Sequence, residues 1–123
     1  MIENRLTSLM DIEATYQRGF EFRCQGQYDA AKVEFQKVLS VESSHTQSLH
    51  QLALIMGFEG DFDNSLARLA ELSAKHPQNN DLRYDLAMTQ MMLGDYEAAC
   101  GNLRLILASD PTHEKAGQQI IYC

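Results

Sequence analysis

Small and large apolar side chains alternate along this chain in a pattern that repeats every 34 residues. The large positions include Phe35, Leu69 and Leu103, and the small positions include Ala31, Ser65 and Ala99. In each period a bulky residue follows the small one four positions later, and such spacing places both on one face of an α-helix. We therefore predict helices near residues 12–25, 28–41, 46–58, 62–75, 80–92 and 96–109.

The ends of the predicted helices coincide with residues that interrupt helices. The first helix of each pair ends at a glycine, in turn Gly26, Gly60 and Gly94. Glycine readily adopts the left-handed conformation that terminates a helix. Asp61 and Asp95 follow two of these glycines and can cap the next helix. Pro77 and Pro111, again 34 residues apart, follow the second helix and mark the start of a new pair.

From about Ile12 to Pro111 this pattern resembles the tetratricopeptide repeat (TPR) family. The resemblance implies an all-α fold, a right-handed α-solenoid of stacked antiparallel helix pairs. It divides the chain into an N-terminal helical extension (1–11), three repeats (12–45, 46–79 and 80–111) and a capping helix (112–123). The large apolar residue that the family places early in the first helix is replaced by Thr15 and Arg83, which should weaken contacts to the preceding unit.

The net charge of −7 is unevenly distributed, since eight acids and three bases lie between Glu59 and Glu97. A nucleic-acid-binding protein needs clustered Lys and Arg, so we predict no nucleic-acid partner. A solvated acidic face is the simpler interpretation, and a patch that attracts a basic partner is the alternative.

The three cysteines, Cys24, Cys100 and Cys123, are odd in number and far apart, without a CxxC pair. This usage predicts reduced thiols in a cytoplasmic protein. The opening residues do not resemble a signal peptide, and the longest apolar run is too short to cross a bilayer, so we predict no membrane association.

The sequence carries no motif for catalysis or for a cofactor. A phosphate-binding glycine loop, a nucleophile elbow and a dinucleotide fingerprint are all missing. His45 and His50 are five residues apart, whereas helical zinc ligands are four apart. Glu13 and Asp81 could form a carboxylate pair across a groove, but acids are plentiful in this chain and nothing distinguishes these two from the others. We predict no enzyme activity, no metal and no cofactor.

The TPR resemblance implies a concave groove, lined by the first helix of each repeat, that binds a partner. The matching residues are Tyr16, Phe20, Arg23, Gln47, His50, Leu54, Asp81, Tyr84, Met88, Met91 and Tyr122. We expect a non-catalytic interaction module, an adaptor or small chaperone, that takes an apolar peptide or helix flanked by Lys or Arg. The alternative is that the methionines belong to the core and only the tyrosines are exposed.

Some TPR proteins clamp the acidic C-terminal tails of heat-shock chaperones with Lys, Arg and Asn. The matching positions here are Tyr16, Phe20, Gln51, Asp81 and Asp85, none of which is basic. A carboxylate would be repelled there, so we predict no binding of such tails. In architecture the chain resembles instead the three-repeat chaperones of bacterial type III secretion, which hold apolar segments of secreted partners.

An apolar stripe, Ile2, Leu6 and Leu9, precedes the first repeat and continues its helical spacing. It is either an extension of the first helix, giving one helix over residues 2–25, or a surface that pairs with a second chain. The alternative function is therefore a self-assembling structural unit that dimerises through this stripe or through the terminal helix.

Sedimentation separates these two functions. A protein that binds partners through its groove needs no second copy, and we expect it to sediment as a monomer at micromolar concentration. A concentration-dependent dimer that a Leu6→Ser change dissociates would favour self-assembly instead.

Overall fold

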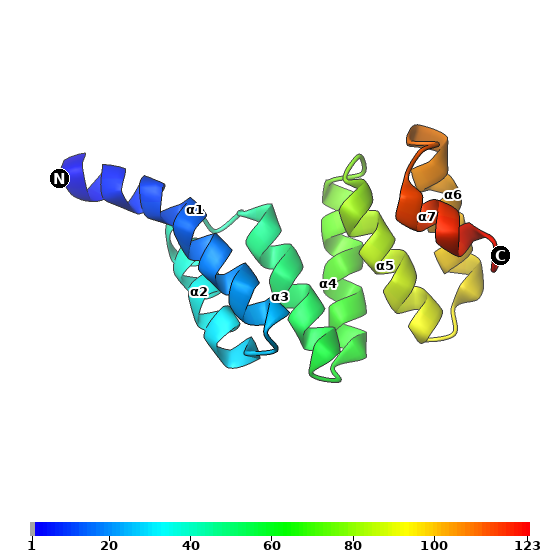
Figure 1. The fold of residues 1–123 in the computed structure, drawn as a ribbon, viewed down its shortest axis with the longest axis horizontal. Coiled ribbons are helices and arrows are strands. Elements are labelled where there is room, and N and C mark those ends of the chain that lie inside the picture. The colour runs from blue at the N-terminus through cyan, green and yellow to red at the C-terminus, as the bar shows by residue number, and fades with distance from the viewer. Residues whose placement is uncertain (1) are drawn as a thin grey trace. The chain divides into compact units, whose positions relative to one another are not determined.

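The computed structural model describes the backbone of residues 2–123 and the side chains of residues 11–123. Over this range the chain is all helical, without a strand, as predicted. The elements are α1 (Ile2–Cys24), α2 (Tyr28–Val41), α3 (Thr46–Phe58), α4 (Phe62–Lys75), α5 (Asn80–Met92), α6 (Tyr96–Ser109) and α7 (Glu114–Ile120) (Figure 1). Helices α2 to α6 begin and end at the predicted residues, and α7 is shorter than the predicted 112–123.

The chain divides into two compact units, with the boundary inside α3. Unit 1 extends to Ile55, and unit 2 begins at Met56. Among the described helices, none has the length and apolar character that a membrane crossing requires.

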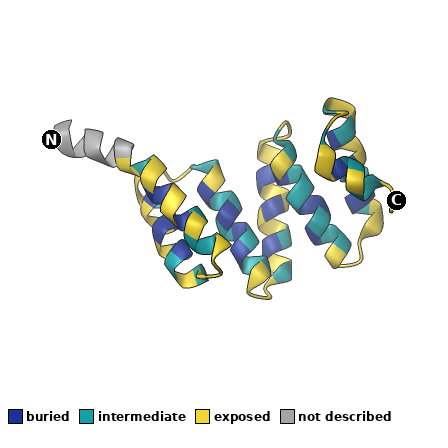
Figure 2. Ribbon diagram, in the orientation of Figure 1, coloured by how far each residue is buried: buried dark blue, intermediate teal, exposed yellow. Residues whose placement is uncertain are grey.

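The core of unit 1 forms where α1 packs against α2. Its buried members are Tyr16, Ala31, Phe35, Val38 and Ile55. Figure 2 shows buried positions in dark blue along both helices. Gly19 lies at this crossing, and a Cβ atom added to it would lie 2.7 Å from Cε1 of Phe35. Phe35 is fully buried, so its ring has little room to move away. The spacing of small and large residues therefore sets how closely the two helices approach.

Unit 2 repeats this arrangement along α4, α5, α6 and α7, each helix packing on the next. The buried cluster consists of Ala87, Ala99, Leu103, Ile106 and Ala116. Ala87 of α5 and Ala99 of α6 are fully buried, as their positions in the repeat predicted. Ala116 shows that α7 covers apolar surface of the last pair, which is the role expected of a capping helix.

The glycine prediction is confirmed, and one of the capping predictions is wrong. Gly26, Gly60 and Gly94 have φ values of 76°, 92° and 86°. The Asp95 carboxylate accepts a hydrogen bond from the Ala98 backbone N–H at 3.3 Å and caps α6. Asp61 makes no such bond in α4. Its carboxylate accepts instead from the Asn64 side-chain amide at 2.9 Å.

The prediction of reduced thiols is wrong for two of the three cysteines. Cys100 of α6 and Cys123 form a disulfide, whereas Cys24 is free and exposed. The pair forms because α7 packs back on α6 and the chain turns after Ile120, which carries Cys123 to the side of α6. A separation of 23 residues follows neither the repeat period nor a cysteine motif, so the sequence alone does not reveal it.

Two glycine-to-alanine substitutions test the close packing of α1 on α2. Gly19→Ala should lower the free energy of unfolding by about 1–3 kcal/mol, because the new methyl group overpacks against Phe35. Gly101→Ala is the matched control, since a Cβ atom there meets nothing within 4 Å. This second change should raise stability by about 0.5–1 kcal/mol through helix propensity. Urea denaturation of both variants gives the two values, and equal stabilisation by both would contradict the packing described.

Candidate functional site

The predicted groove residues lie on the first helices of the pairs and on the C-terminal segment. Unit 1 carries one group, which we call the α1–α3 face: Tyr16, Phe20, Arg23, Gln47, His50 and Leu54. Unit 2 carries Asp81, Tyr84, Met88, Met91 and Tyr122. Each group has its own geometry.

Tyr16 is a core residue of unit 1, with 7% of its surface exposed. Its ring centroid lies 5.6 Å from that of Phe35 and 5.6 Å from that of His45. Burial raises the pKa of the Tyr16 phenol, and the nearby Arg23 guanidinium offsets part of this effect. Tyr16 therefore supports the α1–α3 face from below, and a charged substitution there would disrupt the core.

Gln51 of α3 is the most unusual polar group beneath this face. Its side-chain amide hydrogen-bonds the Tyr16 phenol, and the residue is 7% exposed. The Gln51 Oε1 atom has no hydrogen-bond partner among the described residues. Leaving a buried acceptor unpaired costs about 1–3 kcal/mol, and because this oxygen is itself buried, a partner bound at the surface does not reach it. Gln51 was compared above with a clamp position but was not predicted as a groove residue.

The outer part of the α1–α3 face is mixed in character. The Arg23 guanidinium lies 5.0 Å from the centroid of the half-buried Phe20 ring, in a cation–π contact. His50 and Leu54 of α3 are half-buried, and Gln47 is exposed. This face offers limited apolar area together with hydrogen-bonding groups.

In unit 2, the apolar side chains of α5 are only partly covered. Tyr84, Met88 and Met91 are half-buried and pack against the core cluster of unit 2, as does Ile120 of α7. Met88 and Met91 are therefore neither fully in the core nor fully exposed. Met92, the next residue, is 67% exposed.

Two further residues from the start of α7 adjoin Tyr84. The His113 ring centroid lies 5.9 Å from that of Tyr84, and Lys115 Nζ lies 5.8 Å from the Tyr84 centroid. His113 is fixed there because its Nδ1 atom accepts the Ala116 N–H at 3.1 Å and caps α7. We call the set Tyr84, Met88, Met91, His113, Lys115 and Ile120 the α5–α7 face. The last three were missed in the sequence, because the direction in which α7 packs depends on tertiary contacts.

The remaining predicted residues of unit 2 are exposed. Asp81 is exposed at the start of α5, and Tyr122 lies beyond α7 with 75% of its surface exposed. The pKa of the Tyr84 phenol is raised by burial and by the neighbouring Asp85 carboxylate. Tyr84 is therefore a neutral hydrogen-bonding group at physiological pH.

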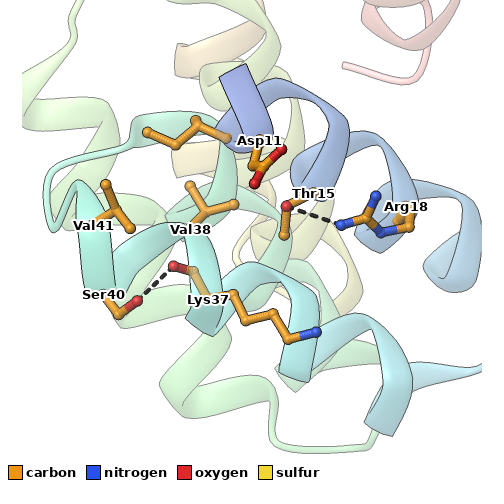
Figure 3. Close-up of a pocket in the computed structure, with 8 residues that line it drawn as sticks. Asp11, Thr15, Arg18, Lys37, Val38, Ser40 and Val41 are labelled. Atoms are coloured by element: carbon orange, nitrogen blue, oxygen red, sulfur yellow. Dashed lines mark hydrogen bonds between the residues drawn. The ribbon is translucent and has the colours of Figure 1, made fainter. Parts of the chain in front are cut away.

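A separate cleft of about 330 Å³ lies in unit 1 between α1 and the end of α2 (Figure 3). Thr15 lines it and accepts a hydrogen bond from Arg18 at 3.0 Å. Both cations at the cleft, Arg18 and Lys37, approach the buried Glu34 carboxylate, at 3.7 Å and 3.2 Å. Since the Glu34 carboxylate and Asp11, which also lines the cleft, together balance these two cations, the cleft holds little attraction for an anion.

Unit 2 has a cleft of about 430 Å³ at the corresponding repeat positions. Arg83 takes the place of Thr15 there and donates hydrogen bonds to Asn102 Oδ1 at 3.0 Å and to the Pro77 carbonyl at 3.1 Å. In both clefts a polar residue, Thr15 or Arg83, thus occupies the position at which the TPR family places a large apolar residue. Among the described residues, no group of His, Cys, Asp or Glu side chains is arranged to hold a metal ion.

Comparison with known proteins identifies the family of this chain. The sequence profile of the tetratricopeptide repeat family matches residues 59–120. No curated protein matches the sequence.

Several solved structures share the fold. A Thermobaculum terrenum O-GlcNAc transferase mutant is similar with a TM-score of 0.82 and 21% identity over 92% of this chain. The Yersinia enterocolitica type III secretion translocator chaperone SycD has a TM-score of 0.77 and 15% identity, over 91% of this chain and 89% of its own. PcrH, in complex with the chaperone binding region of PopB, has a TM-score of 0.73 and 18% identity, over 89% of this chain and 91% of its own. The chain spans only 22% of the transferase chain.

The buried phenol of Tyr16 predicts a specific alkaline transition. Because the folded-state pKa of Tyr16 is raised above 10.0, the folded state favours the neutral phenol. The associated stability is fully present below the unfolded-state pKa and is lost as the pH rises through the folded-state pKa. Tyrosinate absorbance against pH should show a phase above pH 10 that diminishes in Tyr16→Phe and, separately, in Tyr84→Phe. An unchanged titration in Tyr16→Phe would contradict the burial of this group.

Proposed function

This chain belongs to the tetratricopeptide repeat family, and from that premise we propose that it is a non-catalytic protein-interaction module. As an adaptor or small chaperone, it binds an apolar peptide or helix of a partner protein on the exposed faces of its first helices. The observation that carries this proposal is the α5–α7 face, where apolar side chains are anchored in the core on one side and open on the other.

The composition of this face suits a reversible protein interface. Met88 and Met91 are flexible and polarizable, so they adapt to partner side chains of different shapes. Tyr84 supplies apolar area together with a hydroxyl group. Because all three are already packed against unit 2, less side-chain freedom is lost on binding than from fully exposed residues.

The charge around the face favours a partner with basic flanks. Asp81 is exposed one turn before Tyr84 on α5, and the stretch from Glu59 to Glu97 carries eight acids and three bases. Lys115 is the one cation of the α5–α7 face. A segment with Lys or Arg beside its apolar residues gains favourable long-range attraction, which an acidic segment does not.

The fold relatives support the same function. PcrH and SycD are chaperones that this chain matches over most of both lengths, and PcrH is solved with the chaperone binding region of PopB. The transferase similarity carries no catalysis to this chain, because it covers 22% of that enzyme.

Selection from a random peptide library tests the proposal. The wild-type protein should enrich peptides with clustered apolar residues flanked by Lys or Arg. Met88→Glu with Met91→Glu should weaken binding of the enriched peptides by about tenfold or more, because a carboxylate would be buried against apolar groups. Affinity is measured by fluorescence anisotropy.

Met92→Glu is the matched control, since it adds the same charge to the same helix at an exposed position. It should leave affinity unchanged within about twofold, as expected for a surface substitution. Thermal unfolding establishes that all variants are folded. Enrichment of acidic peptides, or equal losses in the Met92 control, would exclude this function for the α5–α7 face.

A further inference from the structure

The C-terminal helix α7 is held to unit 2 by few non-covalent contacts. It runs only from Glu114 to Ile120, and Ala116 is its one buried residue. Ile120 is partly buried against the core cluster, and a Cβ atom added to Gly117 within the helix would meet nothing within 4 Å. A helix this short has little stability of its own in water.

A covalent bond supplements these contacts. The disulfide joins Cys123, just beyond α7, to Cys100 in the first half of α6, and so closes a loop of 23 residues around α7. Such a cross-link removes many of the open conformations that the segment after Ser109 would otherwise explore. Ile121 and Tyr122, which precede Cys123, are 74% and 75% exposed. Their side chains therefore contribute little to holding the C-terminal end in place.

We propose that the Cys100–Cys123 pair is a reversible redox control on the docking of α7. In the oxidised state the disulfide holds α7 over the end of unit 2. In the reduced state the C-terminal end of α7 detaches from α6, and the apolar surface beneath Ala116 and Ile120 becomes accessible. This control belongs to the chain itself and does not depend on the proposed function, although it would alter the α5–α7 face by removing the side chains that α7 contributes.

The exposure of the two cysteines determines which sulfur atom an external thiolate attacks. Cys123 is exposed and Cys100 is 7% exposed, so an external thiolate reaches the Cys123 sulfur. A glutathione thiolate attacks Cys123 Sγ, forms a mixed disulfide with it, and releases Cys100 as a thiolate that takes up a proton. A second glutathione thiolate attacks the glutathione sulfur of the mixed disulfide and releases Cys123. In total, two glutathione molecules are oxidised to one disulfide, and two protein thiols form.

Hydrogen exchange and thiol counting test the proposal on the full chain. In oxidised glutathione, alkylation of the denatured protein should leave Cys100 and Cys123 unmodified, and in reduced glutathione it should modify all three cysteines. Amide exchange over residues 116–123 should be roughly tenfold to a hundredfold faster in the reduced protein, because the cross-link no longer limits opening. Exchange within α5 should change much less.

Two variants make the result specific. Cys123→Ser alters an exposed side chain and should show fast exchange over 116–123 in both redox states. Cys24→Ser is the matched control, because Cys24 is exposed and outside the disulfide, and should behave as the wild type. Three modifiable thiols in oxidised glutathione would overturn the proposal, as would equal exchange of 116–123 in the oxidised and reduced wild-type protein.

Discussion

In the first repeat the two helices approach so closely that one added methyl group at the crossing would overpack it. In the first repeat, a Cβ atom on Gly19 would lie 2.7 Å from the buried Phe35 ring. In the second, a Cβ atom on Gly57 would lie 3.1 Å from Ser65 Oγ. In the third, Ala87 and Ala99 are fully buried. The dense packing of protein interiors makes such positions intolerant of added volume.

This constraint determines which side of each first helix remains open. Because the side of α5 that carries small residues packs against α6, Met88 and Met91 lie at the edge of the contact and are only partly covered. The same crossing in unit 1 buries Tyr16 against Phe35 and leaves Phe20 half-buried. The candidate binding surfaces are thus a consequence of the packing, and their side chains are positioned by the core.

Much of this fold could be predicted because the information is local and repeats. The bounds of α2 to α6 follow from three glycines and two prolines that recur with the same period, which makes coincidence a poor explanation. The positive φ of the turn glycines follows from the same argument. Even so, Asp61 and Asp95 behave differently, because the residue three positions later, Asn64 in one case and Ala98 in the other, determines what the carboxylate bonds.

The candidate site was less predictable because it depends on contacts between distant segments. Tyr16 matches a groove position in the repeat, yet His45 and Gln51 bury it. His113 and Lys115 approach Tyr84 only through the direction of α7, and the Cys100–Cys123 disulfide depends on the same return of the chain. The repeat pattern predicts a contact only where the residues have equivalents in other repeats. The contacts of α7 have no such equivalents, because α7 is a single helix after the last pair.

The central claim is that a partner contacts the open side of the α5 methionines. The most direct measurement is methyl NMR of the protein labelled at its six methionines, titrated with a selected apolar peptide that carries basic flanks. We predict shifts of the Met88 and Met91 methyl signals on binding, with the Met92 signal unmoved. Binding that shifts Met92 while Met88 and Met91 remain unchanged would contradict the account.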